Sequence, residues 1–145
     1  LGVADSKMLR RIAETLDAMG VRKALVVHGG GTDEIALHAE TRALKLADGT
    51  VEEIIITPED AGLARASLSV VTGGDATENA ARLRALLDGA GTQAERDIVA
   101  LNAGALLMTA GRADTLRAGV AAAADALGSG AAGKVLDAFV EASHG

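Results

Sequence analysis

The spacing of apolar residues changes along this 145-residue chain, and each spacing predicts a different element. After a short apolar stretch at residues 1–4, apolar side chains recur every three or four positions, which is typical of an amphipathic helix. These side chains are Met8, Leu9, Ile12, Leu16 and Met19. Asp5 or Ser6 can cap the start of this helix, and Gly20 can end it.

The next apolar run, KALVVHG at residues 23–29, predicts a strand that is buried on both faces. Together with the first four residues and the intervening helix, it predicts a parallel strand pair joined by a right-handed crossover. Two more strands are expected near residues 41–46 and 51–57, because the dipeptide Asp48-Gly49 between them is a strong hairpin signal. A proline directly after the second of these strands removes a backbone donor and ends it.

The second half of the chain carries mainly helical patterns. The stretch GGDATENA, residues 73–80, reads as a glycine-rich loop opening a helix, and Asp75 followed by Glu78 has the spacing of a capping box. Two further helices are expected to end at Gly111 and Gly128, and a last one follows them.

These elements predict an α/β fold with a partial parallel sheet, a β-hairpin and a mainly helical C-terminal half whose helices cover the sheet. The length fits a single α/β domain over residues 1–145. Hydrophobic residues make up 49% and charged residues 23% of the chain, close to the average of soluble globular proteins.

Charge and composition exclude several functions. The 14 Lys and Arg against 20 Asp and Glu give a net charge of -6, which disfavours binding to nucleic acid or to an anionic membrane. The absence of cysteine excludes disulfides and thiolate chemistry. Phe139 is the single aromatic residue, so stacking platforms for single-stranded nucleic acid are missing. No apolar stretch is long enough to span a bilayer and no signal-peptide pattern is visible, so the expected location is the cytoplasm.

The stretch HGGGTDEI, residues 28–35, carries the strongest candidate chemistry. A strand that enters a glycine turn and then a helix would offer free N–H groups to an anion. The stretch matches neither the P-loop nor the G-x-G-x-x-G fingerprint. Asp33 and Glu34 are neighbouring hard carboxylates that can hold Mg²⁺ together with substrate phosphates. Alternatively, both acids simply favour the positive end of a short helix.

Other polar residues also allow two interpretations. Glu78 and Asn79 either line a site or complete the cap of their helix. Asn102, in the apolar run IVALNAGALL, is either a hydrogen-bonded core amide or a group turned toward a ligand. The three histidines show no metal-ligand spacing, and His28 is expected to form a hydrogen bond at a strand end. No Ser-His-Asp arrangement is visible.

Taken in chain order, the motifs ALVVHGGGTDEI, ITPEDAGL, GGDATENA and LNAGALLMTAG resemble anthranilate phosphoribosyltransferase of tryptophan biosynthesis. The similarity covers nearly the whole chain. Such enzymes transfer the phosphoribosyl group of phosphoribosyl pyrophosphate (PRPP) to the amine of anthranilate and require Mg²⁺. The resemblance implies that Asp33 and Glu34 are the acidic metal-binding pair, with Mg²⁺ as cofactor. No catalytic residue is assigned, and the substrate-binding residues stay unknown.

The resemblance also implies that much of the enzyme is missing. Enzymes of this family are considerably longer, and their N-terminal helical domain and glycine-rich PRPP loop precede the position that corresponds to Leu1. Residues 1–145 are therefore expected to be the C-terminal portion of the α/β domain, inactive alone. A cut sheet edge promotes pairing, so a dimer or higher oligomer is expected. The alternatives are a pyrimidine nucleoside phosphorylase-like enzyme, against which the acidic pair argues, and a non-catalytic assembly or regulatory module.

Overall fold

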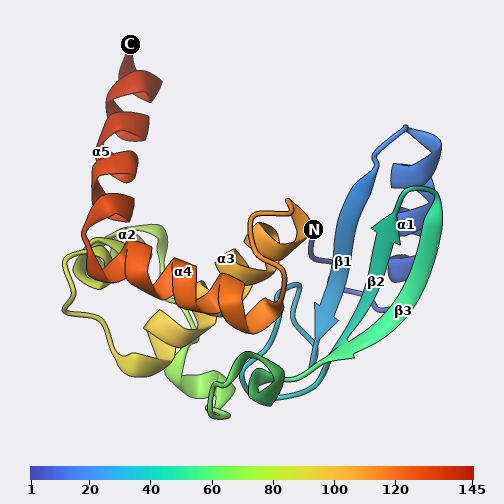
Figure 1. Ribbon diagram of the computed structural model, residues 1–145. Coiled ribbons are helices and arrows are strands. Elements are labelled where there is room, and N and C mark those ends of the chain that lie inside the picture. The colour runs from blue at the N-terminus through green and yellow to red at the C-terminus, as the bar shows by residue number, and fades with distance from the viewer.

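The structure is a computed structural model that describes residues 1–145. A small sheet with one helix on its outer face lies beside a group of four helices (Figure 1). The elements are α1 (Met8–Ala18), β1 (Lys23–Gly29), β2 (Thr41–Ala47), β3 (Thr50–Ile56), α2 (Ala76–Leu87), α3 (Gln93–Thr109), α4 (Leu116–Gly128) and α5 (Ala131–His144). Two short 3-10 helices, Pro58–Ala61 and Leu68–Val70, lie between β3 and α2.

The sheet is antiparallel, with strand order β1-β2-β3. The predicted hairpin is confirmed, since β2 and β3 are joined at Asp48 and Gly49, whose φ angles are +45° and +82°. Positive φ at both central residues is the geometry of the tight turn that suits the twist of paired strands. The predicted strand bounds differ from the observed ones by one residue. The middle of β1 is buried on both faces, as its continuous apolar run predicts.

The predicted parallel pairing is present only as a short bridge between Gly2 and Val27. The Val3 amide donates to the Val27 carbonyl at 3.0 Å, and the Val27 amide donates to the Leu1 carbonyl at 2.9 Å. The three longer strands β1, β2 and β3 pair antiparallel. The link from β1 to β2 contains no helix to carry the chain back across the sheet, so β2 returns antiparallel.

Helix α1 packs on one face of β1 and β2. Its apolar stripe forms a small core with the sheet, made of Val3, Leu9, Ala13, Val26 and Leu44. The predicted caps are partly wrong. Lys7 occupies the N-cap position without a side-chain bond, while Asp5 accepts from the Lys7 amide in the preceding turn. Gly20 ends the helix as predicted, with φ +82°. Met8 and Met19 of the predicted stripe are exposed.

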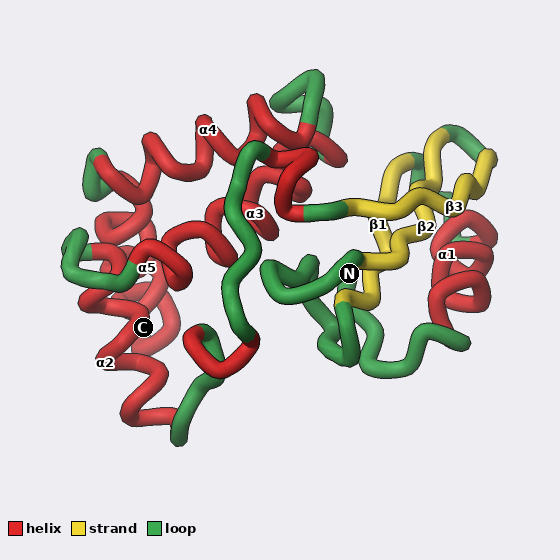
Figure 2. Tube along the Cα trace, turned by 90° about the horizontal axis from the view of Figure 1, so that it is seen from below, coloured by secondary structure: helices red, strands yellow, loops and turns green.

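Helix α3 covers the opposite face of β1 and joins the sheet to the helical group (Figure 2). The larger core runs from Leu25 and Ala43 of the sheet through Leu101 of α3 to Val120 of α4. At Gly104 the two helices approach so closely that a Cβ atom would lie 2.5 Å from the Val120 amide nitrogen.

The prediction that the C-terminal helices cover the sheet is therefore correct for α3 but wrong for α2 and α5. These two helices pack against α4 and against each other, away from the strands (Figure 1). Helix α5 contains no buried residue.

No helix follows the glycine turn, which corrects the expectation for HGGGTDEI. Residues 32–40 form an irregular connection between β1 and β2. Three consecutive side chains in it, Ile35, Ala36 and Leu37, are buried. An α-helix places successive side chains about 100° apart, so a helix here would turn part of this apolar run away from the core. Asp33 and Glu34 consequently do not cap a helix, and that alternative is excluded.

Candidate functional site

The chain leaves β1 through a tight turn at the three glycines. The Thr32 amide donates to the Gly29 carbonyl and the Gly29 amide donates to the Thr32 carbonyl, both at 3.0 Å. The two central residues, Gly30 and Gly31, have φ angles of +55° and +93°. Residues with a Cβ atom are strained in this conformation, so the turn requires glycine at these positions. Asp33 then follows directly after the turn.

The first glycine of the three serves a different purpose, because it makes room for the acidic segment. A Cβ atom on Gly29 would clash with the Glu34 carbonyl and would lie 2.8 Å from the Ala36 amide nitrogen. Gly2 has the same role from the other side, since a Cβ atom there would overlap the Asp33 carbonyl. The backbone of the acidic pair is thus enclosed between β1 and the N-terminal segment.

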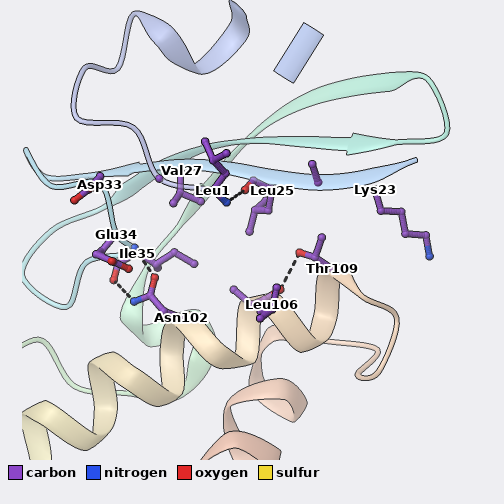
Figure 3. A pocket seen from close by; sticks show the side chains of 13 residues that line it. Leu1, Lys23, Leu25, Val27, Asp33, Glu34, Ile35, Asn102, Leu106 and Thr109 are labelled. Carbon is purple, nitrogen blue, oxygen red and sulfur yellow. Dashed lines mark hydrogen bonds between the residues drawn. The ribbon is translucent and has the colours of Figure 1, made fainter. Parts of the chain in front are cut away.

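Two hydrogen-bond systems, one of them long-range, hold the residues after the acids. The Asn102 Oδ1 of α3 accepts from the Ile35 amide at 2.9 Å, and its Nδ2 donates to the Ile35 carbonyl at 3.0 Å (Figure 3). One residue further, the Ala36 amide donates to the buried Thr41 Oγ1 at 3.0 Å. Asn102 also donates to the Ile98 carbonyl, so its amide is fully engaged. The interpretation of Asn102 as a hydrogen-bonded amide is therefore correct, but the residue is half-buried and lines a cavity rather than lying in the core.

Neither acidic side chain is engaged by the protein. The carboxylates of Asp33 and Glu34 accept no hydrogen bond and join no ion pair, and both residues are exposed. Partial burial raises the pKa of the Glu34 carboxyl above its ordinary value, and the negative charge of Asp33 adds to that rise. A cation bound between Asp33 and Glu34 would stabilise both negative charges and so oppose the rise in the pKa of Glu34.

The acids lie at the edge of a cavity of about 420 Å³ between β1 and α3. Asp33 is at one end of the cavity and Lys23 at the other, while Asn102 and Leu106 of α3 form its lower side in the view of Figure 3. The wall between them is largely apolar, including Leu25 of β1. A ligand in this space would meet negative charge at one end and positive charge at the other.

The donor set fits Mg²⁺ bound jointly with a substrate. No group of three or more His, Asp or Glu side chains is placed to hold a metal ion by itself. Magnesium keeps several waters and usually takes one or two protein carboxylates together with substrate phosphates. Asp33 and Glu34 offer two such carboxylates, and both are free of protein partners.

The motif GGDATENA is not brought to the acidic pair. Asp75 accepts from the amides of Thr77 and Glu78, and the Glu78 carboxylate accepts from the Asp75 amide, which confirms the predicted capping box. Asn79 accepts from the Gly74 amide and donates to the Gly74 carbonyl, both at 2.9 Å. The interpretation of Glu78 and Asn79 as parts of a helix cap is therefore correct, and their helix packs against α4 and α5.

Each of the three histidines lies within hydrogen-bonding distance of a backbone carbonyl. His28 Nδ1 lies 2.9 Å from the Val3 carbonyl, as expected for a hydrogen bond at a strand end. His38 Nε2 lies 3.1 Å from the Gly30 carbonyl and braces the glycine turn. His144 bonds within its own helix. The sequence pattern does not reveal the roles of Gly2 and Thr41. Gly2 leaves room for the Asp33 carbonyl and Thr41 accepts from the Ala36 amide, and no local pattern predicts either contact.

Fold and site together define an α/β domain that presents two adjacent carboxylates, free of protein partners, at the edge of a cavity. The chain belongs to the glycosyl transferase family: residues 1–133 match that family's a/b domain. None of its helices combines the length and hydrophobicity needed to cross a membrane.

Known relatives confirm the resemblance seen in the motifs. The anthranilate phosphoribosyltransferase of Sorangium cellulosum (strain So ce56) is 53% identical over 144 residues, which are 99% of this chain and 41% of that enzyme. The crystal structure of anthranilate phosphoribosyltransferase from Thermus thermophilus matches with 41% identity and a TM-score of 0.88, over 97% of this chain and 41% of that one.

A third relative shares the fold at lower identity. The Saccharomyces cerevisiae enzyme in complex with PRPP and Mg matches with a TM-score of 0.87 and 21% identity, over 97% of this chain and 41% of that one. The chain therefore spans about two fifths of the length of these relatives.

Proposed function

We propose that this chain is the C-terminal portion of the α/β domain of an anthranilate phosphoribosyltransferase, with Asp33 and Glu34 as its magnesium-binding pair. The observation that carries the proposal is the acidic pair itself, whose carboxylates are free of protein partners at the edge of a cavity. Two features of the relatives support the proposal: they are anthranilate phosphoribosyltransferases, and the Saccharomyces cerevisiae enzyme forms a complex with PRPP and Mg. In a biosynthetic enzyme of this kind we expect a cytoplasmic location.

The proposed reaction exchanges one bond at the anomeric carbon of the ribose. The bond from this carbon to pyrophosphate breaks, and its electron pair leaves with the pyrophosphate. The lone pair of the anthranilate nitrogen forms the new bond, and the nitrogen releases one proton. Bound Mg²⁺ would supply positive charge that neutralises the departing pyrophosphate. Little proton chemistry is required of the protein, which agrees with the missing acid-base constellation.

The residues of this chain would bind and orient rather than react. Asp33 and Glu34 would hold the metal, and the glycine turn with the Asn102 and Thr41 bonds would fix their backbone. The turn at Gly30 and Gly31 carries no side chain that could block access to the acids. Residues that contact PRPP or anthranilate stay unassigned.

The test follows the loss of anthranilate fluorescence in the presence of PRPP and Mg²⁺. The chain alone should be inactive, and mixing it with a separately made N-terminal portion of a relative should produce activity. Asp33→Ala with Glu34→Ala should abolish that activity. Glu52→Ala with Glu53→Ala removes another adjacent acidic pair, on β3, and serves as the control with the same change in charge.

Three outcomes would contradict the proposal. Activity that survives in the Asp33→Ala, Glu34→Ala double variant would exclude these residues as the metal pair. Conversion of anthranilate by the 145-residue chain alone would show that this portion suffices. Activity in the mixture that depends on phosphate and a pyrimidine nucleoside, rather than on PRPP, would favour the nucleoside phosphorylase-like alternative.

We also propose that the isolated chain self-associates. Several large apolar side chains lie in water, among them Leu106 beside the cavity and Phe139 on α5, each 70% exposed. Exposed apolar surface of this kind favours pairing with a second copy. Light scattering should give a mass of a dimer or more, and a monomeric mass at high protein concentration would refute the expectation.

A further inference from the structure

The Asn102 side chain acts on the acidic segment as a neighbouring strand would. Its amide accepts from the backbone N–H and donates to the backbone carbonyl of the same residue, Ile35. Ile35 follows Glu34 directly, and its own side chain is only 2% exposed. The segment that carries the acids therefore has its backbone fixed by one side chain from a distant helix.

The helix that supplies this side chain is firmly placed. Leu101, next to Asn102, is fully buried, and Gly104 brings α3 into backbone contact with α4. Asn102 is also tied to its own helix through the Ile98 carbonyl. Because the amide cannot turn without losing three hydrogen bonds, the position of α3 sets the position of the Ile35 backbone.

We infer that Asn102 is a positioning residue for metal binding by Asp33 and Glu34. It touches neither the reacting atoms nor the metal, and it acts by holding the backbone from which both carboxylates project. Partners that orient metal ligands in this way typically change metal affinity about tenfold or more when removed. This inference rests on the proposed function, because it presupposes that the acidic pair binds a divalent cation.

The chain contains a matched control for this role. Asn79 clamps the backbone of Gly74 with the same two hydrogen bonds, at 2.9 Å each. That clamp lies at the exposed start of α2 and is not connected to the acidic pair. Asn102→Ala and Asn79→Ala thus each remove a pair of side-chain hydrogen bonds to one backbone residue. Only the pair made by Asn102 adjoins the acids.

The experiment measures Mn²⁺ binding to the 145-residue chain by water-proton relaxation with PRPP present in every sample, because the acidic pair is proposed to hold the ion together with substrate phosphates. Asn102→Ala should weaken Mn²⁺ binding about tenfold, whereas Asn79→Ala should leave it unchanged. Circular dichroism of each variant reports whether the fold is kept. If Asn102→Ala does not fold, NMR of the unmodified chain decides: Mg²⁺ should shift the Ile35 amide and the Asn102 side-chain amide signals but not those of Asn79.

The outcomes separate this inference from the proposed function. Normal Mn²⁺ affinity in a folded Asn102→Ala variant would overturn the inference and leave the acidic pair as the metal site. Equal loss in both asparagine variants would also overturn it, since the effect would then be one of general stability. Failure of the unmodified chain to bind Mn²⁺, or binding that survives Asp33→Ala with Glu34→Ala, would overturn both.

Discussion

In two glycine-rich loops of this chain, an asparagine side chain accepts from the amide and donates to the carbonyl of one backbone residue. The two asparagines come from different distances along the chain. Ile35, after the first loop, is clamped by Asn102, which lies 67 residues away on another element. Gly74, in the second loop, is clamped by Asn79, five residues further along the same segment. The first clamp joins parts of the fold, whereas the second organises only its own helix start.

This difference in sequence separation distinguishes the candidate metal site in the first loop from the helix cap in the second. A pair of ligands needs a backbone fixed relative to the rest of the molecule, which requires contacts from distant elements. A helix start needs only its own free amides satisfied, which local side chains achieve. Both loops are rich in glycine and acidic residues, so their sequences look alike. The range of their contacts distinguishes their roles.

The largest expected effect comes from forcing a side chain into the first loop. Gly29→Ala should cost about 3 kcal/mol in the free energy of unfolding, because the new Cβ atom would meet backbone atoms of Glu34 and Ala36 that cannot swing aside. Gly73→Ala meets side-chain atoms of Asn79 instead and should cost less than about 1 kcal/mol. Urea unfolding measures both, and similar costs would remove the distinction between the loops.

A smaller effect is expected from deleting the cap of the second loop. Asp75→Ala removes the acceptor for the Thr77 and Glu78 amides and should lower the free energy of unfolding by about 1 kcal/mol. The same variant should leave Mn²⁺ binding at the first loop unchanged. A parallel loss of metal affinity would show that the two loops are coupled after all.

The smallest expected effect is a difference in acid sensitivity. Beside the second loop, Arg82 of α2 donates to the Thr72 carbonyl and to the Glu95 carboxylate of α3. Hydrogen bonds from the Thr92 backbone, followed by those from Arg82, lower the pKa of Glu95 from 4.5 to about 2. A lowered carboxyl pKa contributes stability that is complete above pH 4.5 and is lost as the pH falls toward 2.

Urea midpoints at pH 5 and pH 3 test this dependence. The fall between the two should be smaller in Glu95→Gln than in the unmodified chain. The bonds to Ile35 and Ala36 in the first loop come from uncharged groups and do not titrate in this range. The raised pKa of Glu34 has the opposite sign, because protonation there neutralises a partly buried charge and, to a lesser extent, relieves repulsion from Asp33 in the folded state. Equal acid dependence in both proteins would exclude the Glu95 contribution.

The local features of the fold could be predicted from the sequence, whereas the relations between distant segments could not, apart from the parallel bridge between Gly2 and Val27. The hairpin at Asp48-Gly49 and the cap at Asp75 depend on residues within a few positions of one another, and both are confirmed. The prediction of a helix after the glycine turn is wrong, because the burial of three consecutive side chains outweighs the helix-start pattern of glycines followed by acids. The contact between Asn102 and Ile35 joins residues that no periodicity relates.

The separation between Asn102 and Ile35 also bears on the order of folding. Contacts between residues far apart in sequence require closure of a long loop, and they form slowly compared with turns and helix caps. The hairpin at Asp48-Gly49 and the cap of α2 need no such closure, whereas Ile35 is clamped only when α3 has docked against β1. We therefore expect the acidic pair to reach its final position late, so that Mn²⁺ affinity during refolding is gained with the slowest phase rather than with the first helix signal.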